Sequence, residues 1–384
     1  MDFSEVIGQK HLKAHLLKTI ENGRIPHAQL FVGATGSGLL PMALAYAQEV
    51  LCSLHSKGSP SYLACAGKVK KLAHPDLHFI YPVNTNDTVK KKAVSANFAG
   101  AWRTFVFKNP YASLFDWLQS IGIENKQGNI SVSEAQDLLK TLALKSYEGG
   151  YKVMIIWMAD RMNTESSNKI LKIVEEPPKK TLLLLLTEAE ENIISTIRSR
   201  CQKLDFAALS EENITSRLIN KHGVSEMNAK KVSRQAGGDL NKALHILNND
   251  SDDLVFEKWF ISWVRTAFAA KGNKGAINEL LEWSENIATK GRETQKKFIS
   301  YCMELFRQAL LKNYKADSLL FFESKDAKFS IDKFAPFIHQ NNIFEITTAL
   351  EDASYHIERN GNPKIIFTDL SIKLTRLIHA KELA

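Results

Sequence analysis

The chain has 384 residues, enough for two or three domains that each bury a core of their own. Hydrophobic residues make up 44% and charged residues 24%, which is typical of a soluble globular protein. The net charge of +8 is compatible with a nucleic-acid or acidic partner but does not require one. No apolar run approaches the roughly 20 residues of a membrane span, and the first residues do not resemble a secretory signal. The sequence therefore excludes a membrane partner and predicts a cytoplasmic protein.

Four scattered cysteines in a chain of this length predict reduced thiols. They are Cys52, Cys65, Cys201 and Cys302. The first two are also weak candidates for a zinc site, with His55 or His74 as further ligands. Structural zinc usually takes four N or S ligands with paired C-x₂₋₄-C spacing, and these isolated cysteines lack that spacing. No bound metal is expected.

The N-terminal part predicts a helix, a strand, a glycine-rich loop and a second helix. Apolar residues between Leu12 and Ile20 indicate the first helix, which ends at Asn22-Gly23. An apolar run then leads into the loop Gly33–Gly38, and an amphipathic segment follows from Met42 to Leu51. The order is that of a phosphate-binding P-loop, G-x-x-x-x-G-K-[ST], whose glycines let backbone N–H groups point at a phosphate. The glycines are Gly33, Gly36 and Gly38.

The loop lacks the two side chains that its chemistry needs. A P-loop uses lysine at its seventh place for the β- and γ-phosphates and a hydroxyl at its eighth for Mg²⁺. Leu39 and Leu40 occupy these places, with Pro41 behind them. Leucine neither neutralises a phosphate nor binds a cation, so no bound nucleotide cofactor is expected.

Residues 83–128 form a polar insertion after a predicted strand that ends near Pro82. The insertion contains Lys90-Lys91-Lys92 and several aromatic residues, a combination that could grip single-stranded nucleic acid. The favoured alternative is a solvated loop followed by a helix whose aromatic face joins the core. The aromatic residues are Trp102, Phe105, Phe107, Tyr111, Phe115 and Trp117.

A second stretch with missing chemistry follows a helix predicted at Ile130–Tyr147. The continuous apolar run between Lys152 and Asp160 indicates a central parallel strand. In a P-loop ATPase this strand ends in an acidic pair, which holds Mg²⁺ and polarises the attacking water. The pattern would be D-E-A-D, whereas this chain has Trp157-Met158-Ala159-Asp160, so both acids at the hydrolytic places are missing.

The rest of the chain predicts the remaining strands and then helices only. A helix from Asn163 to Glu176 stops at Pro177-Pro178, and strands follow at Thr181–Leu186 and Leu204–Phe206. This strand–helix alternation predicts an α/β fold with a doubly wound parallel sheet. Short helices follow to a break near 248–253, and a helical bundle is expected beyond it. The residues expected in the core of the bundle are Phe260, Val264, Phe268, Leu281, Phe298, Leu305, Leu310, Ile346 and Leu350.

These stretches resemble the clamp-loader branch of the AAA+ superfamily, and within it the delta-prime type of subunit of bacterial DNA polymerase III. The resemblance covers residues 1–250, and residues after 250 match only as an all-helical tail. Its most specific part combines three elements in register. They are the S-R-C element Ser199–Cys201, the N-x-L-L-K-like stretch Asn168–Lys172 and the E-E-P-P stretch Glu175–Pro178. The segments that carry it are Phe3–Gln9, Pro26-His27-Ala28, Gly33–Gly38, His74-Pro75-Asp76, Ala159–Asn163, Asn168–Lys172, Glu175–Pro178 and Thr196–Cys201.

The resemblance implies an AAA+ P-loop domain at 1–206, a helical lid at 207–250 and an all-helical oligomerisation (collar) domain at 251–384. It implies a non-hydrolysing subunit in the ring that loads a sliding clamp onto primed DNA. The expected partners are the ATPase subunits and a delta-like subunit, with the clamp and primer–template DNA contacted through the complex. ATP would be bound by neighbouring subunits, so the chain is not expected to be an enzyme in isolation. A DNA-directed DNA polymerase activity could be attributed to the chain only as a part of the holoenzyme.

By the same comparison Arg200 matches an arginine finger that acts in trans on a neighbour's ATP. A guanidinium suits this role because it stays charged and spreads its donors over several phosphate oxygens. Asn241 stands where an ATP-contacting arginine would be expected, with Lys242 beside it. Clamp-loader subunits also commonly carry four zinc cysteines after the P-loop helix, and this chain has at most Cys52 and Cys65 there.

Two rival interpretations remain. The first is an ATPase with an atypical phosphate-binding lysine, for which Lys152, Lys169 and Lys172 are candidates. It would still need the acids that Trp157 and Met158 do not provide. The second is a free-standing DNA-binding protein, which predicts a more basic chain with a groove-reading motif.

Overall fold

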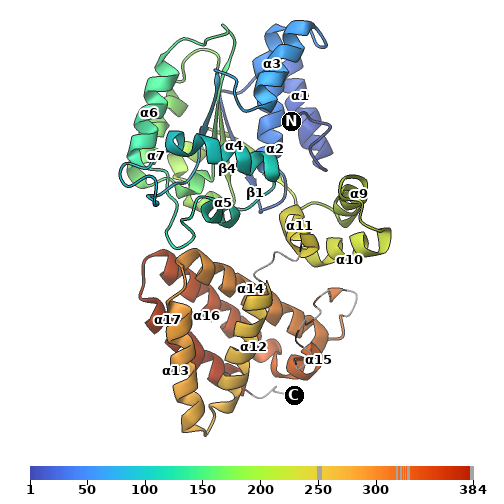
Figure 1. Ribbon diagram of the computed structural model, residues 1–384, viewed down its shortest axis with the longest axis vertical. Coiled ribbons are helices and arrows are strands. Elements are labelled where there is room, and N and C mark those ends of the chain that lie inside the picture. Colours follow the sequence, from blue (N-terminus) through green and yellow to red (C-terminus); the bar gives the residue numbers. More distant parts are fainter. Residues whose placement is uncertain are drawn as a thin grey trace. The chain divides into compact units, whose positions relative to one another are not determined.

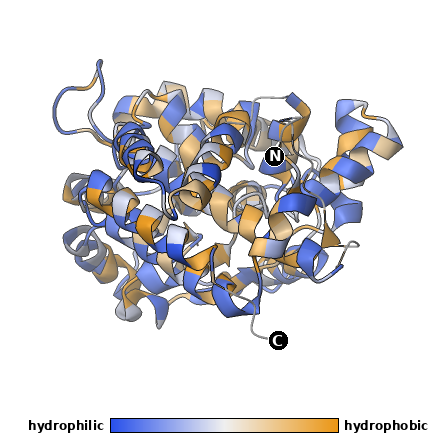
Figure 2. Ribbon diagram, turned by 90° about the horizontal axis from the view of Figure 1, so that it is seen from below, coloured by the Kyte–Doolittle hydropathy of each residue, from blue (hydrophilic) through white to orange (hydrophobic). Residues whose placement is uncertain are grey.

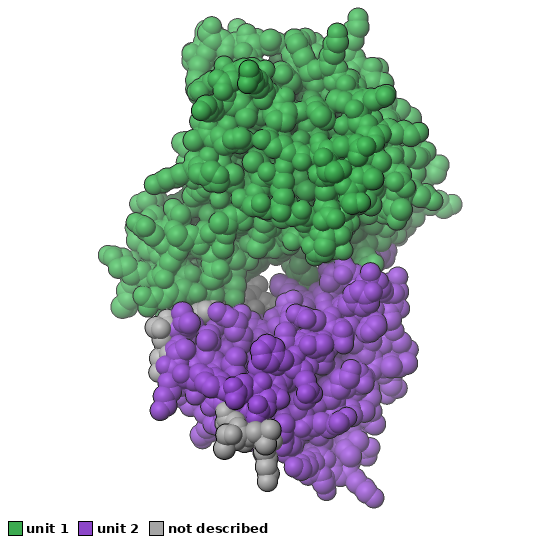
Figure 3. Space-filling view, turned by 180° about the vertical axis from the view of Figure 1, so that it is seen from behind, with its two compact units in different colours: residues 1–123, 127–247 green, residues 124–126, 248–384 purple. Residues whose placement is uncertain are grey.

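The computed structural model describes residues 1–248, 253–316, 319–320, 322, 324, 326 and 329–380. The chain forms two compact units, residues 1–123 with 127–247 and residues 124–126 with 248–384 (Figure 3). The boundary at 247/248 lies close to the one expected at 250/251. Part of the break predicted near 248–253, residues 249–252, lies outside the described residues. No helix of the described residues is long and apolar enough to cross a membrane.

The first unit is built on a five-stranded parallel sheet, as predicted (Figure 1). The strand order is β2-β3-β4-β1-β5, so β3, β4 and β1 are interior strands with a neighbour on each side. Ala28 of β1 pairs with Leu183 of β4, and Lys152 of β3 pairs with Thr181 of β4. The strands are β1 Ala28–Gly33, β2 Leu77–Ile80, β3 Lys152–Trp157, β4 Thr181–Thr187 and β5 Gln202–Phe206.

Continuous apolar strands form here because both faces of the sheet are covered. Along β3, Val153 and Ile155 join the hydrophobic cluster of one face, while Met154 and Ile156 join that of the other. The first cluster includes side chains of α1–α5, and the second includes side chains of α6–α8. The helices of this unit before the lid are α1 Lys10–Glu21, α2 Leu39–Leu51, α3 Pro60–Lys70, α4 Ala99–Lys108, α5 Leu114–Ser120, α6 Val132–Ala143, α7 Thr164–Glu175 and α8 Ser195–Arg198.

Local signals set the ends of these helices. Asn163 caps α7, since its Oδ1 accepts a hydrogen bond from the Ser166 N–H at 2.8 Å, and Pro177 follows its end. Helix α6 ends at Ala143, short of the predicted Tyr147. Helix α3 was not predicted, although Ser59 caps it and Pro60 occupies its first position.

Cys52 and Cys65 form a disulfide, so the prediction of reduced thiols is wrong at these two positions. Cys52 follows α2 directly and Cys65 lies within α3, and this helix pair brings their Cα atoms to 5.8 Å, within the range that a disulfide can span. Cys201 and Cys302 are free thiols, as predicted. Burial raises the pKa of Cys201 to about 12, which keeps that thiol protonated at neutral pH.

The insertion packs its aromatic residues into the core, as the favoured alternative predicted. Trp102 stacks on Tyr81 with ring centroids 4.1 Å apart and lies 5.2 Å from both Trp117 and Trp157. Phe107 differs from its neighbours, because 58% of it is exposed.

The lid consists of three short helices within the first unit. They have a small apolar cluster of their own, which also includes Tyr111 of the insertion. The lid helices are α9 Glu211–His222, α10 Glu226–Ala236 and α11 Leu240–Asn248.

The second unit is all-helical in its described part. Its core is rich in aromatic residues, and the Trp263 and Trp283 rings stack 5.1 Å apart. Phe268 and Leu281, which were expected in this core, are 45% and 40% exposed. Figure 2 shows hydrophobic and hydrophilic residues alternating along the helices, as expected for helices with one buried side. The helices are α12 Asp253–Ala269, α13 Lys274–Ala288, α14 Arg292–Asn313, α15 Ile331–Phe334, α16 Gln340–Glu358 and α17 Pro363–Leu377.

Candidate functional site

The loop between β1 and α2 keeps the backbone shape that its glycines allow. Gly36 has φ 74° and Gly38 has φ 102°, a left-handed region that side chains disfavour. Gly38 is the N-cap of α2, so the loop leads directly into a helix N-terminus. A Cβ on Gly33 would lie 2.8 Å from Cβ of Phe206, which explains glycine at the start of the loop.

The residues at the places of the catalytic lysine and hydroxyl are part of the hydrophobic core. Leu39 and Leu40 begin α2, and both are buried in the cluster that covers one face of the sheet. At the end of β3, Trp157 packs against Trp102 and Phe105, and Met158 is buried with φ 54°. All four positions are therefore occupied by apolar side chains that stabilise the fold.

A carboxylate of the lid lies directly against the loop. A Cβ built on Gly36 would lie only 1.9 Å from Oδ1 of Asp239. The same oxygen accepts a hydrogen bond from the Lys242 N–H at 3.1 Å in the first turn of α11. Burial raises the pKa of Asp239 to about 6. At neutral pH this carboxylate repels phosphate at the loop.

Two further acids lie near the loop. Glu188, which follows β4, accepts a hydrogen bond from Oγ1 of Thr35 at 2.7 Å. The surrounding protein, and then the charges of Asp160 and Asp239, raise its pKa to about 7, although part of the side chain reaches solvent. Asp160 accepts a hydrogen bond from Oγ1 of Thr187 at 2.8 Å and pairs with Arg161 at 3.1 Å.

Tyr111 packs against the loop at Gly38. Its ring would lie 3.3 Å from a Cβ on Gly38, and only 4% of the residue is exposed. Its hydroxyl accepts a hydrogen bond from the Ile7 N–H at 2.9 Å, and its ring joins the apolar cluster of the lid. Burial raises the pKa of Tyr111 to about 12, so the hydroxyl stays neutral.

A polar network ties the lid to the insertion, and we call these side chains, together with Tyr111, the latch. Asn241 Nδ2 donates to Asp116 at 2.7 Å, and Asn241 Oδ1 accepts from Asn109 at 2.7 Å. The other Asp116 oxygen lies 3.0 Å from Nε2 of His245. Burial of Asp116 opposes its ionisation, but hydrogen bonds and the His245 charge outweigh burial and hold its pKa well below the usual range. Asn241 therefore fastens the lid to the insertion.

Sequence reasoning assigned no role beside the loop or in the latch to Tyr111, Asp116, Asp239 or His245. The only local signal was Ser113, which forms a capping box with Asp116 and fixes its position at the start of α5.

Arg200 lies between α8 and β5, and 43% of its side chain is exposed. Its Nη2 pairs with Glu175 at 3.0 Å, and its Nη1 donates to the Thr196 carbonyl at 3.1 Å. The guanidinium is thus held at the surface by partners that are themselves partly exposed.

The zinc candidates are engaged in other interactions. Cys65, His74 and Glu148 cluster with ligand atoms within 4.8 Å of one another, but the Cys65 sulfur is bonded to Cys52. His74 Nδ1 accepts the Asp76 N–H at 3.1 Å, which leaves the proton on Nε2, facing Glu148 at 3.2 Å. These donors do not fit a zinc site while the disulfide is formed.

The lysines proposed for an atypical ATPase lie elsewhere. Lys152 is buried, and its Nζ donates to the Thr141 and Leu144 carbonyls at the end of α6. Lys152 lies at the start of β3, whereas the loop follows the end of β1. Because the strands are parallel, Lys152 and the loop lie at opposite ends of the strands. Lys169 and Lys172 are on α7, where Lys169 is half-buried and Lys172 is exposed.

The aromatic residues of the insertion offer little to a nucleic acid. Trp102, Phe105, Tyr111 and Trp117 are buried, so their faces cannot stack on bases. Lys90 pairs with Asp87 at 3.3 Å.

The parallel sheet and the P-loop-like turn, with the lid beside them, define an α/β protein built like the P-loop proteins. The chain belongs to the family described as "DNA polymerase III, delta subunit", whose profile matches residues 8–210. It is 28% identical over 237 residues to DNA polymerase III subunit delta' of Bacillus subtilis, covering 61% of this chain and 58% of that protein. It is 22% identical over 209 residues to subunit delta' of Haemophilus influenzae, covering 54% and 51%. The chain is thus a delta-prime-like member of the clamp-loader family.

Other similarities are more distant. DNA polymerase III subunit tau of Bacillus subtilis is 22% identical over 398 residues, covering 98% of this chain and 62% of that protein. The chain thus spans about three fifths or less of the length of the first curated relatives it matches. A solved gamma subunit-related protein of Thermotoga maritima is 12% identical, with a TM-score of 0.37 over 95% of this chain and 99% of that one. The RuvB Holliday junction branch migration motor of Thermotoga maritima is 13% identical, with a TM-score of 0.39 over 83% and 82%.

Proposed function

We propose that this chain is a non-hydrolysing, delta-prime-like subunit of a clamp loader. It would help to assemble the ring that places a sliding clamp onto primed DNA, beside ATPase subunits and a delta-like subunit. The observation that carries the proposal is the loop Gly33–Gly38, against which Asp239 packs at Gly36 and Tyr111 packs at Gly38. The chain would act in the cytoplasm and would contact the clamp and DNA through the complex.

Charge and space both oppose ATP at this loop. Each charge-assisted contact of the absent lysine would contribute about 1.5–3 kcal/mol. The lysine is replaced by Leu39, and the carboxylate of Asp239 lies against the loop, where a phosphate would need positive charge. The chain has no cofactor and no catalytic activity in isolation under this proposal.

Arg200 supplies the part of the function that acts on a neighbour. Its guanidinium is exposed, and a site unable to hold ATP leaves it no nucleotide of its own chain to contact. We assign it as an arginine finger for ATP bound by an adjacent subunit. Its surface ion pair with Glu175 is weak enough to exchange for a phosphate, since exposed pairs contribute about 0–1 kcal/mol.

Calorimetry with Mg-ATP tests the first part of the proposal. The full chain should give no binding heat at micromolar concentrations, and a micromolar dissociation constant would overturn it. Co-purification with ATPase subunits, followed by an ATPase assay with clamp and primed DNA, tests the second part. Failure to join the subunits would overturn the assignment to the ring.

A further inference from the structure

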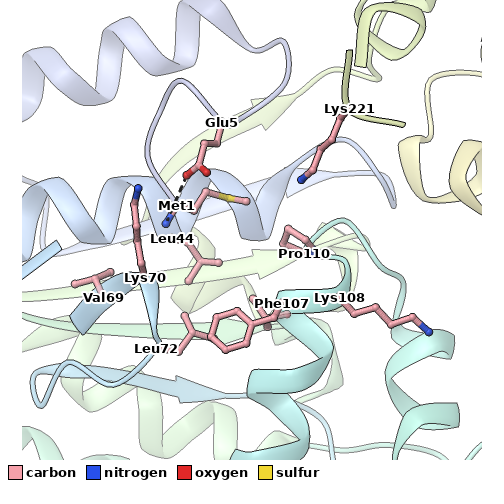
Figure 4. A pocket seen from close by; sticks show the side chains of 11 residues that line it. Met1, Glu5, Leu44, Val69, Lys70, Leu72, Phe107, Lys108, Pro110 and Lys221 are labelled. Atoms are coloured by element: carbon pink, nitrogen blue, oxygen red, sulfur yellow. Dashed lines mark ion pairs between the residues drawn. The ribbon is translucent and has the colours of Figure 1, made fainter. Parts of the chain in front are cut away.

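The first unit has a surface pocket away from the P-loop-like turn (Figure 4). Its volume is about 240 Å³, and side chains of α2, α3, α4 and the N-terminal segment line it. Its floor is apolar, and the exposed Phe107 lies in it. The apolar lining residues are Leu44, Val69, Leu72, Val106, Phe107 and Pro110.

The charges around the pocket are unequal at its two sides. On one side Lys70 pairs with Asp2 at 3.5 Å, and Glu5 pairs with the amino group of Met1 at 3.8 Å. On the other side, beside Pro110, Figure 4 shows Lys108 and Lys221. Within the described part of the chain, neither of these two lysines has an ion-pair partner within 4.0 Å.

A third cation strengthens this imbalance. Arg217 lies one turn before Lys221 on α9, and no acidic side chain of the described residues forms an ion pair with it. Partial burial, and then the charge of Arg217, lower the pKa of Lys221. The charge of Glu5 opposes this shift, so Glu5 supplies one counter-charge near Lys221. Lys108, Lys221 and Arg217 still outnumber it, so an incoming anion would be attracted to this side of the pocket.

We propose that this pocket binds a peptide segment of a partner protein that inserts one large apolar side chain and pairs adjacent carboxylates with Lys108 and Lys221. The volume suits one anchoring side chain, because pockets for drug-sized ligands usually span about 300–1,000 Å³. A polyanion such as single-stranded DNA fits less well, since it needs a track of cations and would also meet the carboxylates of Asp2 and Glu5. The inference does not depend on the proposed clamp-loader function.

Fluorescence anisotropy with the full chain tests the proposal. The probe is a fluorescein-labelled 12-residue peptide with one tryptophan followed by two aspartates in Gly/Ser flanks. Saturable binding is expected, and replacing the tryptophan by alanine or the aspartates by lysines should weaken it at least tenfold. Lys108→Glu combined with Lys221→Glu, and separately Phe107→Ala, should each weaken binding at least tenfold. The matched control is Lys140→Glu, an exposed lysine on α6 outside the pocket, which should bind as the wild type does.

Three results would overturn the proposal. The first is no saturable binding of the peptide, and the second is binding that the pocket variants leave unchanged. The third is tighter binding of a labelled 12-nucleotide oligo-dT that the same variants abolish, which would assign the pocket to nucleic acid. The altered side chains are exposed, so every variant should have a melting temperature close to that of the wild type. Equal melting temperatures would show that weaker binding does not come from unfolding.

Discussion

At the residue scale, the side chains that replace the expected lysine and acid could be read from the sequence. Leu39 and Trp157 lack the required chemistry by residue type alone, so no structure was needed to see that lysine and acid are absent. The packing of Asp239 against the loop could not be foreseen. It depends on where the lid lies, and Asp239 is separated from Gly36 by about two hundred residues of chain.

Buried carboxylates make a residue-scale prediction about pH. Glu134 of α6 is buried and accepts the Ser95 N–H, and burial raises its pKa from 4.5 to about 7. The folded state therefore holds more protons than the unfolded state between these values. The contribution of Glu134 to stability is greatest below about pH 4.5 and falls as the pH rises through about 7.

Glu134→Gln should remove this pH dependence while keeping an acceptor for Ser95. As the pH rises from 5 to 8, the wild type should lose about 2–3 kcal/mol of unfolding free energy that the variant does not lose. This value follows from 1.36 kcal/mol per pKa unit. Urea denaturation at several pH values measures the difference. Glu212→Gln, which changes an exposed acid on α9, is the control. Parallel pH profiles for Glu134→Gln and the wild type would contradict the prediction.

At the element scale, strands were easier to predict than the insertion. The strands β3 and β4 are wholly buried and apolar apart from Lys152 and the two terminal threonines of β4, so their burial on both faces could be read from composition. Helix α3 has a weak apolar pattern and was missed despite its Ser59-Pro60 start. The Cys52–Cys65 bridge was missed because its geometry depends on how that helix packs against α2.

The latch leads to a prediction about the lid. Tyr111→Ala removes a buried ring that joins the loop to the lid core, and such truncations cost about 3–5 kcal/mol. Because the ring bridges these elements, the cost should appear mainly as lid opening. Amide hydrogen exchange in α9–α11 should accelerate at least tenfold, while β3 and β4 keep their protection.

Tyr111→Phe is the matched control, because it loses only the hydrogen bond from Ile7 and keeps the ring. Its lid exchange should change several-fold less than that of Tyr111→Ala. Equal exchange in the two variants would show that the ring does not hold the lid.

At the scale of the whole molecule, the helical unit 248–384 has a core of its own, and we propose that it carries assembly. A truncated chain of residues 1–247 should keep the sheet and its two covering clusters, which lie wholly within that range. It should fold cooperatively and yet fail to co-elute with the partner subunits on size exclusion. Co-elution as complete as that of the full chain would remove the collar assignment.

The proposed role of Arg200 would connect this chain to the ATPase activity of a clamp-loader ring. If it contacts a neighbour's ATP, Arg200→Ala should lower the clamp- and DNA-stimulated ATPase rate of the reconstituted complex. Arginine fingers contribute about 10³–10⁵-fold to turnover in other phosphoryl-transfer systems, but only one of several sites would lose its finger here, so the total rate should fall by a smaller factor. Assembly and stability should be unchanged, because the side chain is exposed.

Two controls separate the role in trans from a structural one. Glu175→Ala breaks the same surface ion pair but leaves the guanidinium, so it should keep the wild-type ATPase rate. Arg234→Ala removes another exposed, paired arginine on the lid and should also leave the rate unchanged. If Arg200→Ala and Glu175→Ala lower the rate equally, the ion pair positions the neighbouring elements and the finger role is wrong. A wild-type rate in a complex shown to contain Arg200→Ala would also rule it out. Loss of activity with Arg200→Ala alone leaves the guanidinium itself as the group that acts on the neighbour's ATP.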